Sequence, residues 1–267
     1  MTTTTATAPL TAAPAYRVTP ARVLRSEWHK LWTLRSTWIT LAATTALTLG
    51  MGAGISAAYD GSGEGGLDTV VFVLLGAQFA TVNLAVLGIL ATAGEYSTGQ
   101  IRATMTAVPR RLPVLWSKAA VLASVAFVLS LWTNLLTFPL AQSFLTGTDQ
   151  AAALGDPGVL RGLAGNAAGL ALLTVLALGL GAVARSVPLA TGAYIGLVMV
   201  VPEVLRMLPY AVVDDAVRYF PSKALESLTA AQHGPDAAAP GAALLALTLW
   251  AAASLAAAAV TLRRRDV

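Results

Sequence analysis

Apolar residues dominate six long stretches of the chain, and short charged segments separate these stretches. The stretches contain no Asp, Glu, Lys or Arg and cover residues 36–59, 69–94, 119–148, 162–184, 186–202 and 237–262. A helix that crosses a bilayer needs about 20 apolar residues, with a range of roughly 17 to 25. The pattern therefore predicts an all-α integral membrane protein with six transmembrane helices. Their expected spans are approximately 37–58, 69–94, 119–146, 162–184, 186–202 and 241–262.

The fifth stretch, 186–202, is the shortest of the six. Pro188 lies near its start and Pro202 at its end. We expect a tilted or broken helix that packs among others, because an unsatisfied backbone is tolerated only away from lipid. The alternative has five spans, with 162–202 as one kinked hairpin. That arrangement places Arg185 alone at depth, at a cost of roughly 2.5 to 3.5 kcal/mol.

An amphipathic segment precedes the first span. Residues 1–18 are rich in Thr, Ala and Pro and are expected to be a disordered lead-in. Residues 19–36 then predict an interfacial helix, with Thr19 as its cap and Pro20 at its first position. Tryptophans suit the headgroup region and basic residues suit anionic lipid. The residues expected to anchor this helix at the membrane interface are Arg25, Trp28, Lys30, Trp32 and Arg35.

The charges fall into two opposite populations. Only 11% of the residues are charged and 56% are hydrophobic, whereas soluble domains have about 25% charged residues. The N-terminus, the gap before 119, Arg185 and the tail 263–267 together hold 13 basic and 3 acidic residues. The alternate gaps hold 4 basic and 10 acidic residues. The positive-inside rule therefore predicts that both termini are cytoplasmic.

The basic gap between the second and third spans predicts a short helix outside the membrane. Ile101, Met105 and Val108 share one side of it, and Pro109 prevents its continuation. Arg102, Arg110 and Arg111 form its rim. A short helix with an apolar face and a basic rim suits docking into the groove of a soluble partner.

This loop resembles the first cytoplasmic loop of bacterial type-2 ABC exporter permeases, with Glu95, Gly99 and Pro109 at the positions that the family shows. Residues 25–38 are similar to the entry helix of that family, and residues 219–224 resemble a stretch before its last span. Members often have Thr after the glycine, where this chain has Gln100. Together with the order of the spans, the resemblance covers nearly the whole chain beyond residue 20.

The resemblance implies a multi-pass permease of the bacterial cell membrane that exports a lipophilic or amphipathic substrate. It also implies a second permease chain, identical or similar, and two copies of a separate ATPase subunit. The ATPase would contact a coupling helix through Glu95, Gly99, Ile101, Arg102, Met105, Pro109, Arg110 and Arg111. A P-loop needs Gly-Lys-Ser or Gly-Lys-Thr, and none of Lys30, Lys118 and Lys223 follows a glycine.

A carrier driven by an ion gradient is the first alternative. Such a carrier usually needs an ionisable residue within its spans, or a broken helix whose carbonyls hold sodium. The six stretches contain no ionisable Asp, Glu, Lys, Arg or His, so polar side chains there are few. Gln78, Asn83 and Asn134 are candidates for lining a substrate path. The competing interpretation makes them hydrogen-bond contacts between helices.

An intramembrane enzyme is the second alternative. His29 and His233 are the two histidines, neither has a metal-ligand companion at i+4, and the chain has no cysteine. We therefore expect no catalytic site, metal or cofactor, and no nucleic-acid partner. The external gap 203–240 is expected either to dip back as a lid over the pathway or to lie on the outer leaflet. Asp214 and Arg218 are spaced to pair on a short helix within it.

Overall fold

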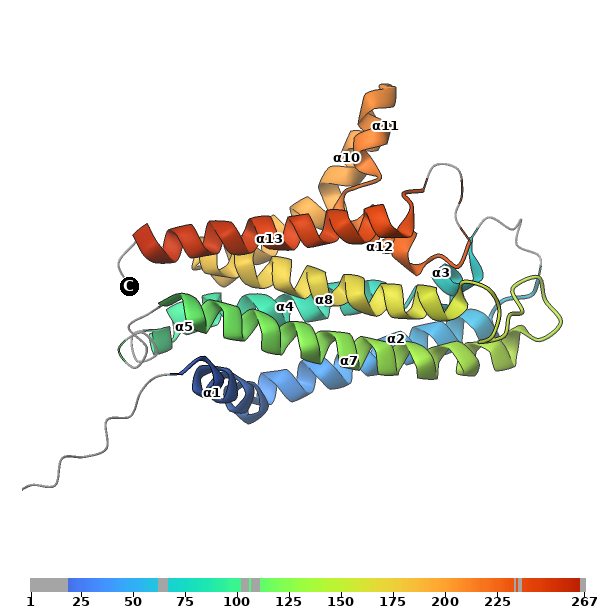
Figure 1. The fold of residues 1–267 in the computed structure, drawn as a ribbon. Coiled ribbons are helices and arrows are strands. Elements are labelled where there is room, and N and C mark those ends of the chain that lie inside the picture. Colours follow the sequence, from blue (N-terminus) through green and yellow to red (C-terminus); the bar gives the residue numbers. More distant parts are fainter. Residues whose placement is uncertain are drawn as a thin grey trace, which may run out of the picture.

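The computed structural model describes residues 19–61, 67–101, 106, 111–232, 234 and 237–264. Every regular element in these ranges is a helix. The long helices run side by side as a bundle (Figure 1). The all-α prediction is confirmed, while the disordered lead-in 1–18 lies outside the described residues.

The amphipathic segment forms α1 (Pro20–Thr33), and the first span forms α2 (Arg35–Ala57). The Thr19 hydroxyl accepts a hydrogen bond from the backbone N–H of Arg22, and Pro20 is the first helical residue, as predicted. Leu34 has an extended backbone and separates the two helices. Figure 1 shows α1 almost end-on and α2 along the bundle, so α1 lies across the bundle direction.

The second predicted span, 69–94, is not one continuous helix. It is divided into α3 (Thr69–Val73), α4 (Ala77–Leu90) and α5 (Ala93–Ser97). The first break lies at Gly76, where an added Cβ would be 2.8 Å from both Met51 Cβ and Thr48 O of α2. The second break lies at Thr92, whose hydroxyl donates to Leu178 O of α8 at 3.0 Å. The first interruption is therefore in contact with α2 and the second with α8.

Two long helices follow, α7 (Arg111–Leu145) and α8 (Val159–Ala184). Pro139 lies inside α7, which neighbouring helices permit in a membrane span. Helix α8 is the most buried candidate span, with 72% of its apolar window buried. It contacts α4, α7, α9, α12 and α13, so the core of the bundle is built around it.

The short fifth stretch is interrupted, as its prolines predict. It consists of α9 (Val187–Ile195), a π-helical turn η1 (Gly196–Val200) and α10 (Val201–Arg206). The expectation that it packs among other helices is only half right. Tyr194 is buried and donates to Thr81 O of α4, yet only 22% of the apolar window is buried. Arg185, with φ 53°, ends α8 before α9 begins, and each of the two segments is long and apolar enough to cross a membrane by itself, which favours two spans over the kinked hairpin.

The gap 203–240 contains α11 (Ala211–Val217) and α12 (Pro221–Thr229), and the last predicted span is α13 (Pro240–Arg264). Figure 1 shows α10 and α11 projecting sideways from the bundle, whereas α12 returns to it. Helix α12 packs against α8 and α13. The predicted Asp214–Arg218 pair does not form, because Arg218 pairs with Asp215 three residues away.

Five helices in the described ranges are long and apolar enough to cross a membrane. They are Arg35–Ala57, Leu112–Leu145, Val159–Ala184, Val187–Arg206 and Pro240–Arg264. The remaining predicted span contributes only Ala77–Leu90 as a shorter apolar helix. The protein is therefore a multi-pass membrane protein by its helices, and a sixth full-length span is not confirmed.

Basic and acidic segments lie at opposite ends of the bundle, apart from the acidic residues of the projecting helices α10 and α11. Helices α1 and α5 and the C-terminal end of α13 share one end in Figure 1, while α3 and the α7–α8 connection lie at the other. The first end carries the basic segments of the sequence, and the second carries Asp60, Asp68, Asp149 and Asp156. We refer to them as the basic end and the acidic end.

Candidate functional site

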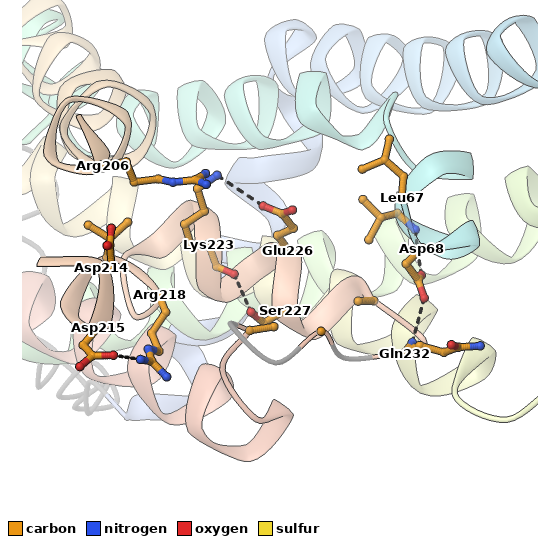
Figure 2. Close-up of a pocket in the computed structure, with 15 residues that line it drawn as sticks. Leu67, Asp68, Arg206, Asp214, Asp215, Arg218, Lys223, Glu226, Ser227 and Gln232 are labelled. Carbon is orange, nitrogen blue, oxygen red and sulfur yellow. Dashed lines mark hydrogen bonds and ion pairs between the residues drawn. The ribbon is translucent and has the colours of Figure 1, made fainter. Parts of the chain in front are cut away.

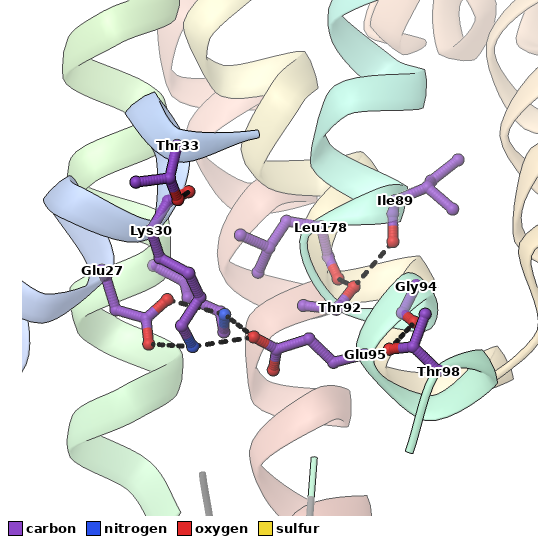
Figure 3. Close-up of polar contacts among 10 residues, drawn as sticks. Glu27, Lys30, Thr33, Ile89, Thr92, Gly94, Glu95, Thr98 and Leu178 are labelled. Carbon is purple, nitrogen blue, oxygen red and sulfur yellow. Dashed lines mark hydrogen bonds and ion pairs between the residues drawn. The ribbon is translucent and has the colours of Figure 1, made fainter. Parts of the chain in front are cut away.

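Four charged side chains meet at the basic end of the bundle. We call Glu27, Lys30, Glu95 and Lys118 the charge cluster; they come from α1, α5 and α7. Lys118 Nζ lies 2.6 Å from Glu27 Oε2 and 2.7 Å from Glu95 Oε1. Lys30 Nζ lies 2.9 Å from both Glu27 Oε1 and Glu95 Oε1. Figure 3 shows Glu27 and Lys30 facing Glu95 across the gap between α1 and α5.

Burial makes this arrangement more than a surface ion pair. Glu27, Glu95 and Lys118 are 6%, 5% and 6% exposed, and the Lys30 side chain is 31% exposed. Two carboxylates face two ammonium groups, so the charges balance. Removing one member would leave an uncompensated charge away from water, which is strongly destabilising. The cluster therefore holds α1, α5 and α7 in one relative position.

The pKa values of two members show which effect dominates. Burial alone would raise the pKa of Glu95, but the ion pairs with Lys118 and Lys30 outweigh it and hold that pKa below its ordinary value. Burial would lower the pKa of Lys30, but hydrogen bonds to Glu27 and Glu95 raise it overall. The contribution of Glu95 to stability is thus present above pH 4.5 and lost as the pH falls through its lowered pKa. That of Lys30 is present below pH 10.5 and lost at higher pH.

Helical spacing places the α1 members. Val23, Glu27 and Leu31 are four residues apart, share one face of α1 and are all buried. The apolar neighbours press this face against α7, which α1 contacts directly. Glu27 is consequently buried together with them, and a buried carboxylate needs cationic or hydrogen-bonding partners. Lys30 lies one turn along and supplies one of these partners.

Helix α5 brings Glu95 to the cluster and is itself held on α8. The Thr92 hydroxyl donates to Leu178 O, and a Cβ added at Gly181 would lie 2.4 Å from Thr92 Oγ1. At the other end of α5, Gly99 has φ +75°, a left-handed conformation that favours glycine and ends the helix. The loop that follows therefore leaves from a fixed point directly beside Glu95.

Arg185 lies at the same end of the bundle as α5. Its guanidinium stacks over the Tyr96 ring, with Cζ 4.9 Å from the ring centroid. Tyr96 follows Glu95 in the chain, so α5 contacts charged groups on two sides. This location agrees with the assignment of Arg185 to the basic segments.

The predicted coupling helix is described only in part. Gln100, Ile101 and Thr106 are helical and Ile101 is buried. Arg102, Met105, Pro109 and Arg110 lie outside the described residues, and Arg111 is the first residue of α7. Ser97 and Thr98 donate their hydroxyls back to Gly94 O of α5 at 2.9 Å. The helix itself stays a prediction.

The expected interface anchors divide into two groups. Trp28, Trp32 and Trp38 form a contiguous aromatic group, with neighbouring ring centroids 5.4 and 5.0 Å apart. Trp28 is exposed, as are Arg25 and Arg35, which suits contact with lipid headgroups. Lys30 differs, because its ammonium group lies in the charge cluster and not toward the headgroups.

The three candidate pathway residues are not brought together. Gln78 is exposed, whereas the Asn83 amide nitrogen is buried without a hydrogen-bond partner among the described residues. Asn134 is buried and donates to Leu163 O and to Asn166 Oδ1 at 3.0 and 3.1 Å. Asn166 in turn donates to Thr229 of α12 at 3.0 Å. Asn134 thus has the geometry of the hydrogen-bond contact between helices that was the competing interpretation.

Two members of the cluster, Glu27 and Lys118, were not among the candidate site residues. A signal for them exists in the charge count, because Glu27 and Glu95 are two of the three acidic residues in the basic segments. A carboxylate next to a membrane span, surrounded by arginine and lysine, has a pairing partner close at hand. The sequence does not reveal which cation it selects, since that choice depends on how α1 folds across α7.

Comparison with protein-family models finds no match for this chain, and comparison with proteins of known function finds no significant similarity. Within the described ranges, no three His, Cys, Asp or Glu side chains are grouped to hold a metal ion. What the site offers chemically is a fixed electrostatic connection between the loop that follows α5 and the helices α1 and α7.

Proposed function

We propose that this chain is the membrane-spanning subunit of a type-2 ABC transporter, exporting a lipophilic or amphipathic substrate from a bacterial cell. A separate ATPase would bind the loop 95–111 and supply the energy. Two permease chains and two ATPase subunits would form the working assembly. The membrane helices support a polytopic protein, and the resemblance of residues 25–38, 95–109 and 219–224 supports this family.

The charge cluster is the observation that carries the proposal. A loop that transmits movement from a soluble subunit must be attached rigidly to the helices that move. Glu95 lies immediately before the loop, and its ion pair with Lys118 reaches the start of α7 immediately after it. Both ends of the loop are therefore joined to each other and, through Glu27 and Lys30, to α1.

This geometry suggests how movement would pass into the membrane. A displacement of the loop would move α5 and the start of α7 together, because separating Glu95 from Lys118 exposes buried charges. Helix α1 would follow, since Glu27 pairs with Lys118 and Lys30 pairs with Glu95. Helix α7 continues for its full length to the acidic end, so a tilt at its base would be felt across the bilayer.

Co-purification tests the partner. The double variant Arg110→Glu and Arg111→Glu reverses the basic rim of the loop, and it should weaken association with the ATPase encoded beside this chain. Reversal of Arg263 and Arg264, which end α13 at the same end of the bundle, provides a matched control. Unchanged recovery of the ATPase with the loop variant would remove the docking proposal. Transport by the purified chain alone in liposomes, driven by a sodium or pH gradient, would favour the carrier instead.

A further inference from the structure

Two cavities of this protein have consecutive residues, Arg218 and Tyr219, in their walls. The first has a volume of about 680 Å³ and lies between the start of α3 and helices α10, α11 and α12. Figure 2 shows its charged side chains, with Arg206 from α10, Asp214 from α11 and Lys223 from α12. It takes in three of the four basic residues of the acidic segments, namely Arg206, Arg218 and Lys223.

Most charges of this polar cavity already have partners in the protein. Lys223 Nζ lies 3.0 Å from Glu203 Oε1 and 3.6 Å from Glu226 Oε2, and Arg218 pairs with Asp215. Asp68 caps α3 and also accepts from the backbone N–H groups of Ala231 and Gln232. Among the described residues, the Arg206 guanidinium and the Asp214 carboxylate make no hydrogen bond or ion pair. Arg206 interacts electrostatically with Glu203 without bonding to it, so its guanidinium donors and the Asp214 carboxylate oxygens remain available on the wall formed by α10 and α11.

The second cavity is an apolar groove of about 570 Å³ along α13. Leu245, Leu249 and Ala253 lie along it at helical spacing, and Tyr219 and Trp250 close one side. Trp250 Nε1 donates to Tyr219 O at 3.1 Å, which fixes that side. The groove runs from Ala242 to Ala253, roughly 16 Å at about 1.5 Å per residue. This is about half the hydrocarbon thickness of a bilayer, or one leaflet.

Consecutive residues join the two cavities. Arg218 lines the polar cavity, and Tyr219, the next residue, lines the groove. A charged recess thus opens beside an apolar channel one leaflet long, starting near the outer end of α13. This is the shape of a phospholipid, with a headgroup at one end and an acyl chain at the other.

We propose that this combined site binds a phospholipid from the leaflet at the acidic end, with a headgroup that carries both a phosphate and a primary ammonium group. Arg206 binds the phosphate and Asp214 binds the ammonium, while one acyl chain lies in the α13 groove. The cavity is lined by four carboxylates and three cations, so a headgroup with only negative charge is disfavoured. Surrounding lipid is as apolar as the groove, and specificity therefore comes from the charged groups. The site does not depend on the proposed ATPase partner.

Native mass spectrometry of the full-length chain in detergent tests this site with phosphatidylethanolamine as the probe and phosphatidylglycerol, which lacks the ammonium group, as the comparison. Phosphatidylethanolamine should bind more tightly. The double variant Arg206→Gln and Asp214→Asn should weaken its binding about tenfold, because hydrogen bonds to charged groups are the strong ones. Arg264→Gln, which removes an exposed charge at the opposite end, should leave binding unchanged.

A second pair of variants tests the chain. Leu249→Trp fills the groove and should weaken binding, whereas Leu244→Trp adds the same ring to an exposed position of α13 outside the groove and should not. Equal binding of the two lipids, or no change with the double variant or with Leu249→Trp, would overturn the proposal. Displacement of the lipid by millimolar inorganic phosphate would also overturn it, since it would indicate a phosphate site that does not require a lipid.

Discussion

Single side chains decide how the basic end of this protein is built. The sequence points to Glu95 because it begins a basic loop, and to Lys30 because it lies on an amphipathic helix. It does not join them, since they are 65 residues apart. Burial of Glu27 beside Val23 and Leu31 is what creates the demand for Lys118. A pairing of this kind depends on tertiary packing and is absent from any local pattern.

Substitution of Lys118 measures how much the cluster contributes. Lys118→Met leaves two buried carboxylates with Lys30 alone, and we expect unfolding to become easier by on the order of 3 kcal/mol. Lys223→Met makes the same change at a pair whose partner Glu203 is 59% exposed, where about 1 kcal/mol or less is expected. Unfolding in detergent mixed with sodium dodecyl sulfate, followed by far-ultraviolet circular dichroism, gives both values. Equal losses would mean that burial adds nothing to the cluster.

At the scale of elements, hydrophobic runs located the long helices but not their interruptions. The predicted spans 119–146, 162–184 and 241–262 lie within or close to α7, α8 and α13. The span 69–94 was wrong as a single helix, because Gly76 and Thr92 are breaks that depend on contacts with α2 and α8. By contrast, Pro188 and Pro202 did predict an irregular fifth stretch, because the effect of proline on helix hydrogen bonds is local.

Small residues of α8 show how one helix holds its neighbours. A Cβ added at Gly162 or Gly165 would lie 2.3 Å from Thr229 O or 2.4 Å from Leu228 O of α12. One added at Gly158, which precedes α8, would lie 2.4 Å from Ala231 O, just after α12. Close approach of backbones through small residues is typical of helix packing in membranes. The glycines at 50, 54, 192 and 196 have no such neighbour within 4 Å, so the presence of a glycine does not by itself mark a close contact between helices of this chain.

A pair of alanine substitutions separates these two kinds of glycine. Gly162→Ala forces a methyl group against Thr229 O and should destabilise the protein by about 2 kcal/mol, as overpacking generally does. Gly192→Ala meets open space inside α9, where alanine favours helix formation, and should cause no loss. The same detergent unfolding experiment compares them. A loss at position 192 as large as that at 162 would contradict the packing argument.

For the whole molecule, the charge alternation predicted that basic and acidic segments occupy opposite ends, and this holds for the segments outside α10 and α11. This works because each span reverses the direction of the chain, so segments that alternate in sequence gather at alternate ends. The sideways projection of α10 and α11 was not foreseen. The sequence left two possibilities for 203–240, a lid over the pathway or a loop on the outer leaflet. It did not predict that α12 returns to the bundle and packs against α8 and α13.

The absence of cysteine from the sequence permits a direct test of which end faces the cytoplasm. In intact cells, an impermeant thiol reagent should label the Gly63→Cys variant, because the acidic segments are expected outside. It should not label Arg110→Cys until the membrane is opened. Labelling of Arg110→Cys in sealed cells would reverse the assignment, and labelling of both would show that the cells had leaked.

The charge cluster also gives membrane insertion an order. Lys118, the partner of Glu27, is synthesised 91 residues later in the chain. At a synthesis rate of about 5 to 20 residues per second, that interval lasts roughly 5 to 18 seconds. Until Lys118 emerges from the ribosome, only Lys30 neutralises the Glu27 carboxylate. Helix α1 should therefore stay at the hydrated surface of the bilayer. Docking of α1 onto the bundle is therefore expected only after α7, which carries Lys118, has been synthesised.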